Sequence, residues 1–401
     1  MAFRIAVSGI QAATADLDVT GNNIANANTT GFKSSRAEFA DVYAASNLGT
    51  SKDAIGAGVA LSRVAQQFTQ GNVSFTENSL DLAINGEGFF TVEDSEGRFY
   101  TRAGAFSLDK DGNVVNATGQ RLLGFQASAG QVTGAIGPLT IRTTNLAPQA
   151  SQQLSVQVNL DAADPVPASA FDPSDPGSYN NSTSLTIFDS LGEEHLGTVY
   201  FRKTGANQWN SYLTVDSTQV GANVAVTFGS DGALQSPTSP QSFGSFTPST
   251  GAAAMPLTID LSGTTQFGAD FGVNALGQDG YTTGRLSGID IDSQGVVLAR
   301  FSNGKTAPQG QVMLANFGNP QGLRPNGDTL WTESSESGPP LAGAPGTAAL
   351  GLVQSGALEE SNVDLAGQFV QMIMTQRGFQ ANSRSITTTD QMMEEVINLK
   401  R

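Results

Sequence analysis

The chain contains no cysteine among its 401 residues. Disulfide bonds, thiolate catalysis and zinc–thiolate sites are therefore excluded together. The absence does not by itself identify a cellular compartment. The single histidine and the two tryptophans further restrict the chemistry that the side chains can supply.

Basic residues are also scarce. The chain has 20 Lys and Arg against 36 Asp and Glu, which gives a formal net charge of −16. Binding to nucleic acid requires Lys and Arg contacts to phosphate, so we expect no nucleic-acid partner. The acidic excess instead favours solubility through self-repulsion.

Long apolar runs are missing as well. No stretch approaches the roughly 20 apolar residues of a membrane span. The N-terminal stretch MAFRIAVSGIQAATADL lacks the continuous apolar core and the cleavage site of a signal peptide. We therefore expect a soluble protein without direct membrane insertion that is not exported through a cleaved signal peptide.

The sequence offers little material for a metal or cofactor site. His195 has only Glu193 and Glu194 beside it, which is too few ligands for the usual zinc set, and a solvated turn is expected there. The stretch DKDGN, which begins at Asp109, lacks the glycine and the glutamate that a calcium loop needs at its sixth and twelfth positions. We expect a turn there, no metal and no cofactor.

Motifs of catalysis are equally scarce. No phosphate loop or dinucleotide motif stands between a strand and a helix, and NGEGFF (85–90) lies in a β context. Counting carboxylates cannot exclude a glycosidase, but two Trp and six Tyr give little material for a sugar cleft. We expect no enzyme and assign no catalytic residue.

What is present begins with a heptad pattern at the N-terminus. Apolar residues recur every seven positions, and a small residue stands three positions after each of the first three. These small residues, Ala6, Ala13 and Thr20, allow a second helix to approach closely. The pattern predicts a helix over residues 1–24, and Gly9 makes it too weak to stand alone. The apolar positions are Phe3, Ile10, Leu17 and Ile24.

A second heptad pattern occupies the C-terminus. Ser361 with Asp364 resembles a capping box, so a helix of about 36 residues is expected to follow. We predict that the two terminal helices pair as a coiled coil; the alternative is that each packs separately on a globular core. The C-terminal stripe contains Leu365, Phe369, Met372, Phe379, Ile386, Met393 and Ile397.

Between the helices the chain is typical of strands and turns. The 46 glycines and the apolar runs that they separate indicate a mainly β protein. Three Asp–x–x–Gly stretches, at 94–97, 189–192 and 292–295, have the residue preferences of type I turns. They predict hairpins and antiparallel sheets.

The composition changes near residue 148. From there to residue 280 the chain has twelve acidic and two basic residues, so this segment carries −10 of the net charge. We predict a multidomain, nested chain of three parts. These are a terminal helical coiled-coil domain (1–30 with 360–401), a middle antiparallel β domain with its connecting segment (31–147 with 281–359), and an inserted outer acidic β domain (148–280).

The stretch GNNIANANTTGFKSS (21–35) combines helical spacing with more Asn and Gly than a helix favours. Together with Leu17 it resembles the N-terminal motif of bacterial flagellar axial proteins, the rod and hook group. Residues 356–386 resemble the C-terminal motif of the same group. The N-terminal positions that match are Leu17, Asn22, Asn23, Ile24, Ala25, Asn26, Thr29, Gly31, Phe32 and Lys33.

The middle of the chain separates the members of this group. Distal rod members are typically shorter, whereas NLDAADPVP and SLTIFDSLGEEHLGTVYF resemble the outer domain of hook members. A long distal rod protein is the nearer alternative. A secreted β-rich adhesive or binding protein, with the terminal helices as an oligomerising stalk, is the more distant one. It predicts a pocket or an aromatic patch in the acidic domain, where the sequence shows no aromatic cluster.

The resemblance implies a structural subunit that polymerises into a flexible helical tube with a central export channel. This tube would be the extracellular hook of the flagellar basal body and would transmit torque from rod to filament. Expected partners are further copies of the chain, the distal rod protein, the hook cap protein, the hook–filament junction protein and the flagellar type III export apparatus.

The two motifs also suggest which residues do this work. The apolar stripes are expected to form the coiled coil and the contacts between subunits. Asn tolerates unusual backbone angles and Gly31 permits left-handed geometry, so the Asn–Gly stretch is expected to join the inner helix to the β layers. A simple helix cap followed by a loop is the alternative. The joint residues are Asn22, Asn23, Ala25, Asn26, Gly31, Phe32 and Lys33.

Overall fold

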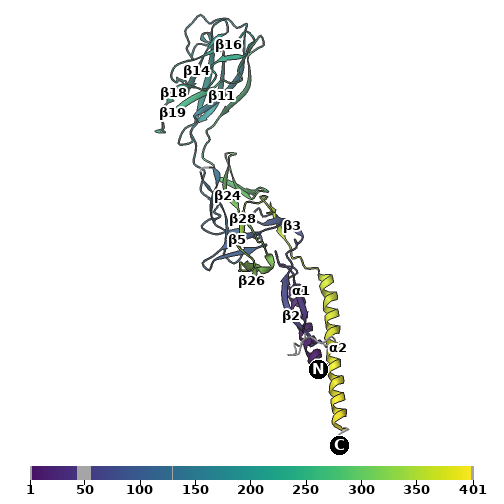
Figure 1. The fold of residues 1–401 in the computed structure, drawn as a ribbon. Coiled ribbons are helices and arrows are strands. Elements are labelled where there is room, and N and C mark those ends of the chain that lie inside the picture. The colour runs from purple at the N-terminus through teal and green to yellow at the C-terminus, as the bar shows by residue number, and fades with distance from the viewer. Residues whose placement is uncertain (1, 43–55, 129, 399–401) are drawn as a thin grey trace. The chain divides into compact units, whose positions relative to one another are not determined.

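The computed structural model describes residues 2–42, 56–128 and 130–398 (Figure 1). The chain divides into two compact units. Unit 1 contains residues 1–143, 288–300 and 306–401, and unit 2 contains residues 144–287 and 301–305. The predicted inserted domain, 148–280, lies inside unit 2, while the division into three parts stays a prediction.

Two helices close the ends of the chain, as the heptad patterns predict. They are α1 (Ala2–Ala25) and α2 (Leu365–Asn398), and they run beside each other in unit 1 (Figure 1). Asn23 near the end of α1 donates to Gln368 at the start of α2 over 3.1 Å. Asp16, two turns earlier in α1, accepts from Gln371 over 2.9 Å. The helices are therefore antiparallel. Among the described residues, no helix is long and apolar enough to cross a membrane.

The start of α2 differs from the predicted capping box. The Asp364 side chain accepts from the Ala366 N–H over 3.1 Å, and its carbonyl accepts the first helical bond from Gln368. Asp364 is therefore the N-cap, and Ser361 lies outside the helix. The prediction of a capping box that begins at Ser361 was wrong: the helix starts at Leu365, and the Ser361 hydroxyl instead accepts from the Val363 N–H over 3.4 Å.

The rest of unit 1 is a 13-stranded main sheet and three small two-stranded sheets. The main sheet contains β5 (Phe89–Glu93), β6 (Arg98–Thr101), β7 (Ser107–Leu108), β8 (Val114–Val115), β9 (Arg121–Ser128), β10 (Gln131–Pro138), β22 (Leu286–Ile291), β23 (Val296–Phe301), β24 (Thr306–Val312), β25 (Leu314–Asn316), β26 (Arg324–Gly327), β27 (Leu330–Thr332) and β28 (Leu341–Gly343). The small sheets pair β1 (Ser35–Asp41) with β2 (Val59–Gln66), β4 (Leu82–Asn85) with β29 (Leu352–Ser355), and β3 (Val73–Phe75) with β30 (Ala357–Glu359).

Unit 2 is a β-sandwich. Its five-stranded sheet contains β11 (Gln153–Asp161), β18 (Gln241–Phe246), β19 (Met255–Asp260), β20 (Thr265–Phe267) and β21 (Gly272–Gln278). Its six-stranded sheet contains β12 (Asn181–Phe188), β13 (Glu194–Gly205), β14 (Gln208–Val215), β15 (Thr218–Gln219), β16 (Val224–Phe228) and β17 (Leu234–Ser236).

Alternation of apolar and polar residues explains this sandwich. Along β11 every second side chain is buried, beginning with Leu154, and the same alternation runs along β13. A strand with one apolar face packs that face against another sheet. The two sheets therefore share one core, to which Val199, Trp209 and Leu257 contribute. Strand β11 pairs in parallel with β19 and β20, so the sandwich is not purely antiparallel.

The three Asp–x–x–Gly turns are confirmed. They connect β5 to β6, β12 to β13 and β22 to β23. In the second, the Gly192 N–H donates to the Asp189 carbonyl over 3.1 Å, while the Asp189 carboxylate accepts from the Leu191 N–H over 2.8 Å. The aspartate thus holds the turn, and Gly192 has a positive φ of 85°. Short-range hydrogen bonding of this kind can be recognised from sequence.

Two short 3₁₀ turns complete the described elements, η1 (Pro176–Ser178) in unit 2 and η2 (Pro320–Gly322) in unit 1. Each begins with proline, whose fixed φ suits a tight turn.

Candidate functional site at the helix–strand joint

The Asn–Gly stretch leaves α1 through hydrogen bonds within its own chain. Asn26 donates from its side chain to the Asn22 carbonyl over 2.9 Å and accepts from the Thr29 hydroxyl over 3.1 Å. The Thr29 N–H donates to the Asn26 carbonyl over 3.1 Å. Asn22 and Ala25 are exposed. This part of the motif is a helix end followed by a turn, as the simpler alternative expected.

Asn23 does more than end the helix. Its side chain is almost fully buried, accepts from the Ser35 N–H over 2.8 Å and donates to the Ser35 carbonyl over 2.7 Å. The same amide donates to Gln368 of α2. One asparagine therefore connects α1, β1 and α2, and we call this region the joint. It comprises residues 22–35, Arg102 and residues 359–368.

Gly31 packs directly against backbone atoms of another segment. Its φ is +69°, and an added Cβ would lie 2.3 Å from the Ala103 backbone nitrogen. Its own N–H donates to the Glu359 carbonyl over 2.8 Å. A side chain here would meet both backbone strain and backbone atoms, so the position requires glycine. Phe32, next in the chain, is half-buried.

Lys33 ends in a buried ionic cluster that the sequence did not reveal. Its ammonium lies 2.5 Å from one Glu359 carboxylate oxygen, and Arg102 lies 3.1 Å from the other. Lys33 also donates to the Thr69 carbonyl over 2.7 Å. We call Lys33, Arg102 and Glu359 the ionic triad. Burial lowers the pKa of Lys33 below its ordinary value, while the neighbouring Glu359 carboxylate opposes that shift.

The triad connects five segments of unit 1, around residues 33, 69–71, 84–86, 102 and 359. Glu359 lies at the end of β30 and also accepts from the Gly71 N–H over 2.9 Å. Arg102 follows β6 and donates to the Ile84 and Gly86 carbonyls over 3.4 and 2.7 Å. Both cations therefore have backbone acceptors in addition to the shared carboxylate. Removal of that carboxylate would leave two buried positive charges without a counter-charge.

Asn362 continues the joint toward α2. Its side-chain oxygen accepts from the Ser34 N–H over 2.7 Å, and its amide donates to the Gln67 carbonyl over 2.7 Å. No pattern in the sequence singles out Arg102, Glu359, Asn362 or Gln368. Glu359, Asn362 and Gln368 lie within the 356–386 stretch and Arg102 follows β6, but only the fold shows that they meet residues 22–35.

The structure places the predicted coiled-coil residues unevenly. In α1, Phe3 is 53% exposed, whereas Ala6 and Thr20 are buried. In α2, polar Gln368 and Thr375 face α1. The remaining predicted positions fall into two groups: Ile10, Ala13, Leu17, Ile24, Met372 and Ile386 are half-buried, and Leu365, Phe369, Phe379, Met393 and Ile397 are exposed. Their role in contacts between subunits stays a prediction.

The expectation of a solvated turn at His195 was wrong. The ring is 7% exposed, and its Nδ1 lies 2.6 Å from Asp216 while its Nε2 lies 3.5 Å from Asp189. Burial lowers the pKa of His195, but hydrogen bonds to these two carboxylates outweigh it, and the net shift is upward. The sequence could not show this, because Asp216 follows 21 residues later and reaches His195 through the sheet.

The acidic segment does contain an aromatic cluster, contrary to expectation. Tyr200 and Tyr212 are paired across β13 and β14, and Phe171 stacks on Tyr212 with ring centroids 3.9 Å apart. Tyr179 joins them 4.8 Å from Tyr200. Arg202 donates to the Pro167 and Ser169 carbonyls, so the loop that carries Phe171 is held against the sheet. The cluster thus packs a loop of its own unit.

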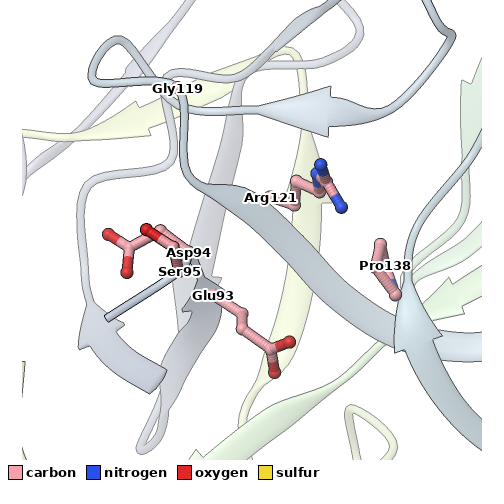
Figure 2. Close-up of a pocket in the computed structure, with 6 residues that line it drawn as sticks. All are labelled: Glu93, Asp94, Ser95, Gly119, Arg121 and Pro138. Atoms are coloured by element: carbon pink, nitrogen blue, oxygen red, sulfur yellow. The ribbon is translucent and has the colours of Figure 1, made fainter. Parts of the chain in front are cut away.

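A polar pocket of about 420 Å³ lies at the end of β5 and the start of β9. Figure 2 shows Glu93 and Asp94 pointing away from each other there. Asp94 accepts from Gln120 over 2.9 Å, and hydrogen bonds lower its pKa. Glu93 pairs with Arg98 over 3.1 Å. The Asp94 carboxylate is thus held ionised by its hydrogen bonds, whereas a general acid needs a raised pKa. Among the described residues, no group of three His, Cys, Asp or Glu is placed to hold a metal ion.

Four family models match the chain in the same order as its elements. Residues 3–33 match the flagella basal body rod protein model, and residues 83–161 match the flagellar hook protein FlgE/F/G D1 domain. Residues 159–281 match the flagellar basal body protein FlaE D2 domain, and residues 354–399 match the flagellar basal body rod FlgEFG protein C-terminal model. The first and last models cover most of the joint.

Curated proteins match over the whole chain. The flagellar hook protein FlgE of Escherichia coli K12 is 40% identical, with all of both chains covered. The flagellar hook proteins FlgE of Salmonella typhimurium and Borreliella burgdorferi are 39% and 34% identical, over 100% and 98% of each chain. The crystal structure of Helicobacter pylori flagellar hook protein FlgE2 aligns with a TM-score of 0.54 over 73% of this chain and all of that one, at 16% identity, and so supports the fold alone.

Proposed function

The chain belongs to the flagellar hook protein family, and on that premise we propose that its copies polymerise into a flexible helical tube that transmits torque from rod to filament. It is a structural subunit of the hook, an extracellular part of the flagellum. The tube would enclose a central channel for export. The observations that support this mechanism are the exposed helix stripes and the joint that holds both helices to the strands.

The helix pair leaves large apolar side chains uncovered in the single subunit. Phe3, Phe369 and Met393 expose 53%, 50% and 59% of their surface. Exposed apolar groups at helical spacing favour association, because their burial releases roughly 25 cal/mol per Å². Copies that bury these stripes against one another through a head-to-tail contact form a helical tube rather than a closed dimer.

The joint explains how such a helix layer could carry torque. Asn23 holds α1 to α2 and β1, and the ionic triad holds the segment after α1 to β30 and to the loop after β6. Force on the helices is thereby passed through several buried polar contacts rather than through one flexible linker. We propose that the joint keeps the helices continuous with the strands while the tube bends.

The acidic segment has a different part in this proposal. It carries −10 of the formal charge, and like charges on neighbouring copies repel over about 8 Å in physiological salt. We propose that the segment lies on the outside of the tube, where repulsion opposes sticking as outer domains slide past one another.

Assembly requires other components of the flagellum. We propose that the distal rod protein, the hook cap protein and the hook–filament junction protein contact the ends of the polymer. We propose the flagellar type III apparatus as the export route. Lack of cysteine suits this route, because a chain threaded unfolded cannot be trapped by disulfides.

Immunogold electron microscopy of isolated flagellar bases tests the proposal, with an antibody raised against residues 148–280. Gold along the curved segment between base and filament supports a hook polymer with this domain outside. Gold confined to the straight rod would contradict it and favour a distal rod subunit. A strain that lacks the protein provides the control for antibody specificity.

A further inference from the structure

Polar contacts recur along the pair that α1 and α2 form. Asn23 of α1 donates to Gln368 of α2 over 3.1 Å, and Asp16 of α1 accepts from the Thr375 hydroxyl over 2.5 Å. From the first contact to the second, α1 goes back by seven residues and α2 goes forward by seven. Two antiparallel helices that repeat in this way meet at the same heptad position of each helix.

Gly9 and Asn382 continue this series. Gly9 lies seven residues before Asp16, and Asn382 lies seven residues after Thr375. A Cβ added at Gly9 would lie 2.8 Å from the Cγ of Asn382, so this side chain lies directly against the glycine. We call these three layers, 23 with 368, 16 with 375 and 9 with 382, the polar seam.

A repeat of seven leaves the register of the helix pair open. If α2 slipped along α1 by one heptad, polar residues of α2 would again lie opposite the seam residues of α1. The predicted apolar stripes also have a period of seven, so they would keep their pattern after the same slip. Neither pattern distinguishes one register from the next, so the choice falls to a residue that bonds well in only one register.

Asp16 has this property. One oxygen of its carboxylate accepts from Gln371 over 2.9 Å and from Thr375 over 2.5 Å. The two donors lie about one turn apart on α2, so they reach the same oxygen together. Hydrogen bonds to a charged group are among the stronger ones in proteins. The register that the structure shows thus gives this carboxylate two side-chain donors.

Neighbouring registers give Asp16 poorer partners. A slip of one heptad in one direction would bring Gly378 and Asn382 to its carboxylate, and the glycine has no side-chain donor. A slip in the opposite direction would bring Asp364 and Gln368, and the two carboxylates would repel each other. Of these three registers, only the one in the structure provides two donors.

We propose that Asp16 fixes the register of α2 on α1, because its hydrogen bonds are complete in only one of the registers that the heptad repeat allows. The register decides how the exposed apolar side chains of the two helices line up. Every copy would then present the same surface to its neighbours, as identical contacts in a helical polymer require. This consequence for assembly rests on the proposed polymer, whereas the register is a property of one chain.

Absence of cysteine makes the register measurable. The pair Gly9→Cys with Asn382→Cys reports the register of the structure, since these positions are within reach of a disulfide. The pair Gly9→Cys with Thr389→Cys reports a slip of one heptad. Isolated hooks, or the purified full chain where a variant forms none, are oxidised briefly. The rate of disulfide formation within one chain is then read from gel mobility without reductant.

With Asp16 present, the 9–382 disulfide should form at least about tenfold faster than the 9–389 disulfide. Asp16→Leu should bring the two rates to within about threefold, because the acceptor that distinguishes the registers is gone. Asp16→Asn keeps one side-chain oxygen and should restore most of the preference. Asp18→Leu alters an exposed residue of the same helix and is the matched control. Lower stability alone would slow both disulfides together and leave their ratio unchanged.

The joint is the competing anchor, because Asn362 ties the segment before α2 to Ser34. An Asp16→Leu chain that keeps the tenfold preference would assign the register to the joint and overturn the inference, and the proposed polymer would stand. Failure of the unmodified chain to form hooks would instead contradict the proposed function and leave the register of the single chain intact.

A second measurement covers the case in which cysteines disturb the seam. Spin labels on Gln11→Cys and Gln391→Cys occupy exposed positions, and labelled chain is diluted into unlabelled chain. A slip of seven residues moves one label by about 10 Å along the helix axis. Asp16→Leu should therefore add a second distance between the labels to the one found with Asp16. One unchanged distance in both chains would overturn the inference.

Discussion

The helix pair of unit 1 and the sandwich of unit 2 differ in how far they bury their apolar side chains. In the sandwich, Val199, Phe201 and Leu213 are fully buried, and the two sheets cover each other. In α2, Phe369 and Met393 expose half or more of their surface. The sandwich is thus complete within one chain, whereas the helices depend on the joint and, as we propose, on neighbouring copies.

The largest expected effect breaks the joint. Glu359→Gln removes the carboxylate shared by Lys33 and Arg102, and unpaired buried charges cost about 3–5 kcal/mol. We expect the urea midpoint of unit 1 to fall and hooks to be lost, while the unfolding of unit 2 is unchanged. Glu360→Gln is the matched control, because Glu360 is exposed. Equal stability of the two variants would show that the triad is unimportant.

The converse change breaks the sandwich. Leu213→Ala removes a fully buried side chain, which costs about 2–5 kcal/mol. Calorimetry should show a lower melting temperature for unit 2 with the unit 1 transition retained, and hooks should still form at low temperature. A simultaneous shift of both transitions would contradict the independence of the two units.

Smaller changes in stability, of opposite sign, are expected when either of two glycines of unit 1 is replaced by alanine. Gly31→Ala should destabilise by more than about 1 kcal/mol, since φ is positive and the Ala103 backbone occupies the space. Gly21→Ala should stabilise α1 by about 1 kcal/mol, because Gly21 is helical with no heavy atom within 4 Å of an added Cβ. Denaturant unfolding measures both. Shifts in the same direction would refute the role given to Gly31.

The pH dependence of unit 2 gives the next comparison. Folding raises the pKa of His195 above its ordinary value of 6.5. The charged ring therefore stabilises unit 2 fully below about pH 6.5, and this stabilisation is lost as the pH rises through the pKa that His195 has in the folded chain. Unit 2 should therefore become less stable as the pH rises above about 6.5, and His195→Gln should remove that slope. Melting temperatures between pH 5.5 and 9 test this. A wild-type curve that is flat or rises would contradict the assignment.

The smallest effect concerns charge. Glu193→Gln, Glu194→Gln and Asp270→Asn neutralise exposed acids whose side chains make no hydrogen bond within the described part of the chain. We expect unchanged stability but altered bending stiffness of hooks at low salt, with the difference disappearing as salt screens the charges. Glu96→Gln with Asp111→Asn in unit 1 is the control. Equal bending stiffness of variant and wild-type hooks at every salt concentration would contradict the proposed role of the acidic segment.

Elements built from neighbouring residues could be predicted from the sequence. The period-seven stripes predict α1 and α2 to within a few residues, and the Asp–x–x–Gly stretches predict three hairpins. The Asn–Gly motif lies where the chain leaves α1, and its role as a joint stays a prediction. These features depend on residue spacing, helix periodicity and turn preference. Each acts over a few neighbouring residues and can therefore be recognised in the sequence.

Partners far apart in sequence could not be predicted. Lys33 meets Glu359 across 326 positions, and His195 meets Asp216 across a sheet. Several acids could have served each cation equally well, since charge alone does not specify which pair meets. The sequence by itself determined the terminal helices, the turns, the acidic segment and the family. Only the tertiary structure decided which buried charges pair, because that choice depends on the register of strands and the backbone room at Gly31.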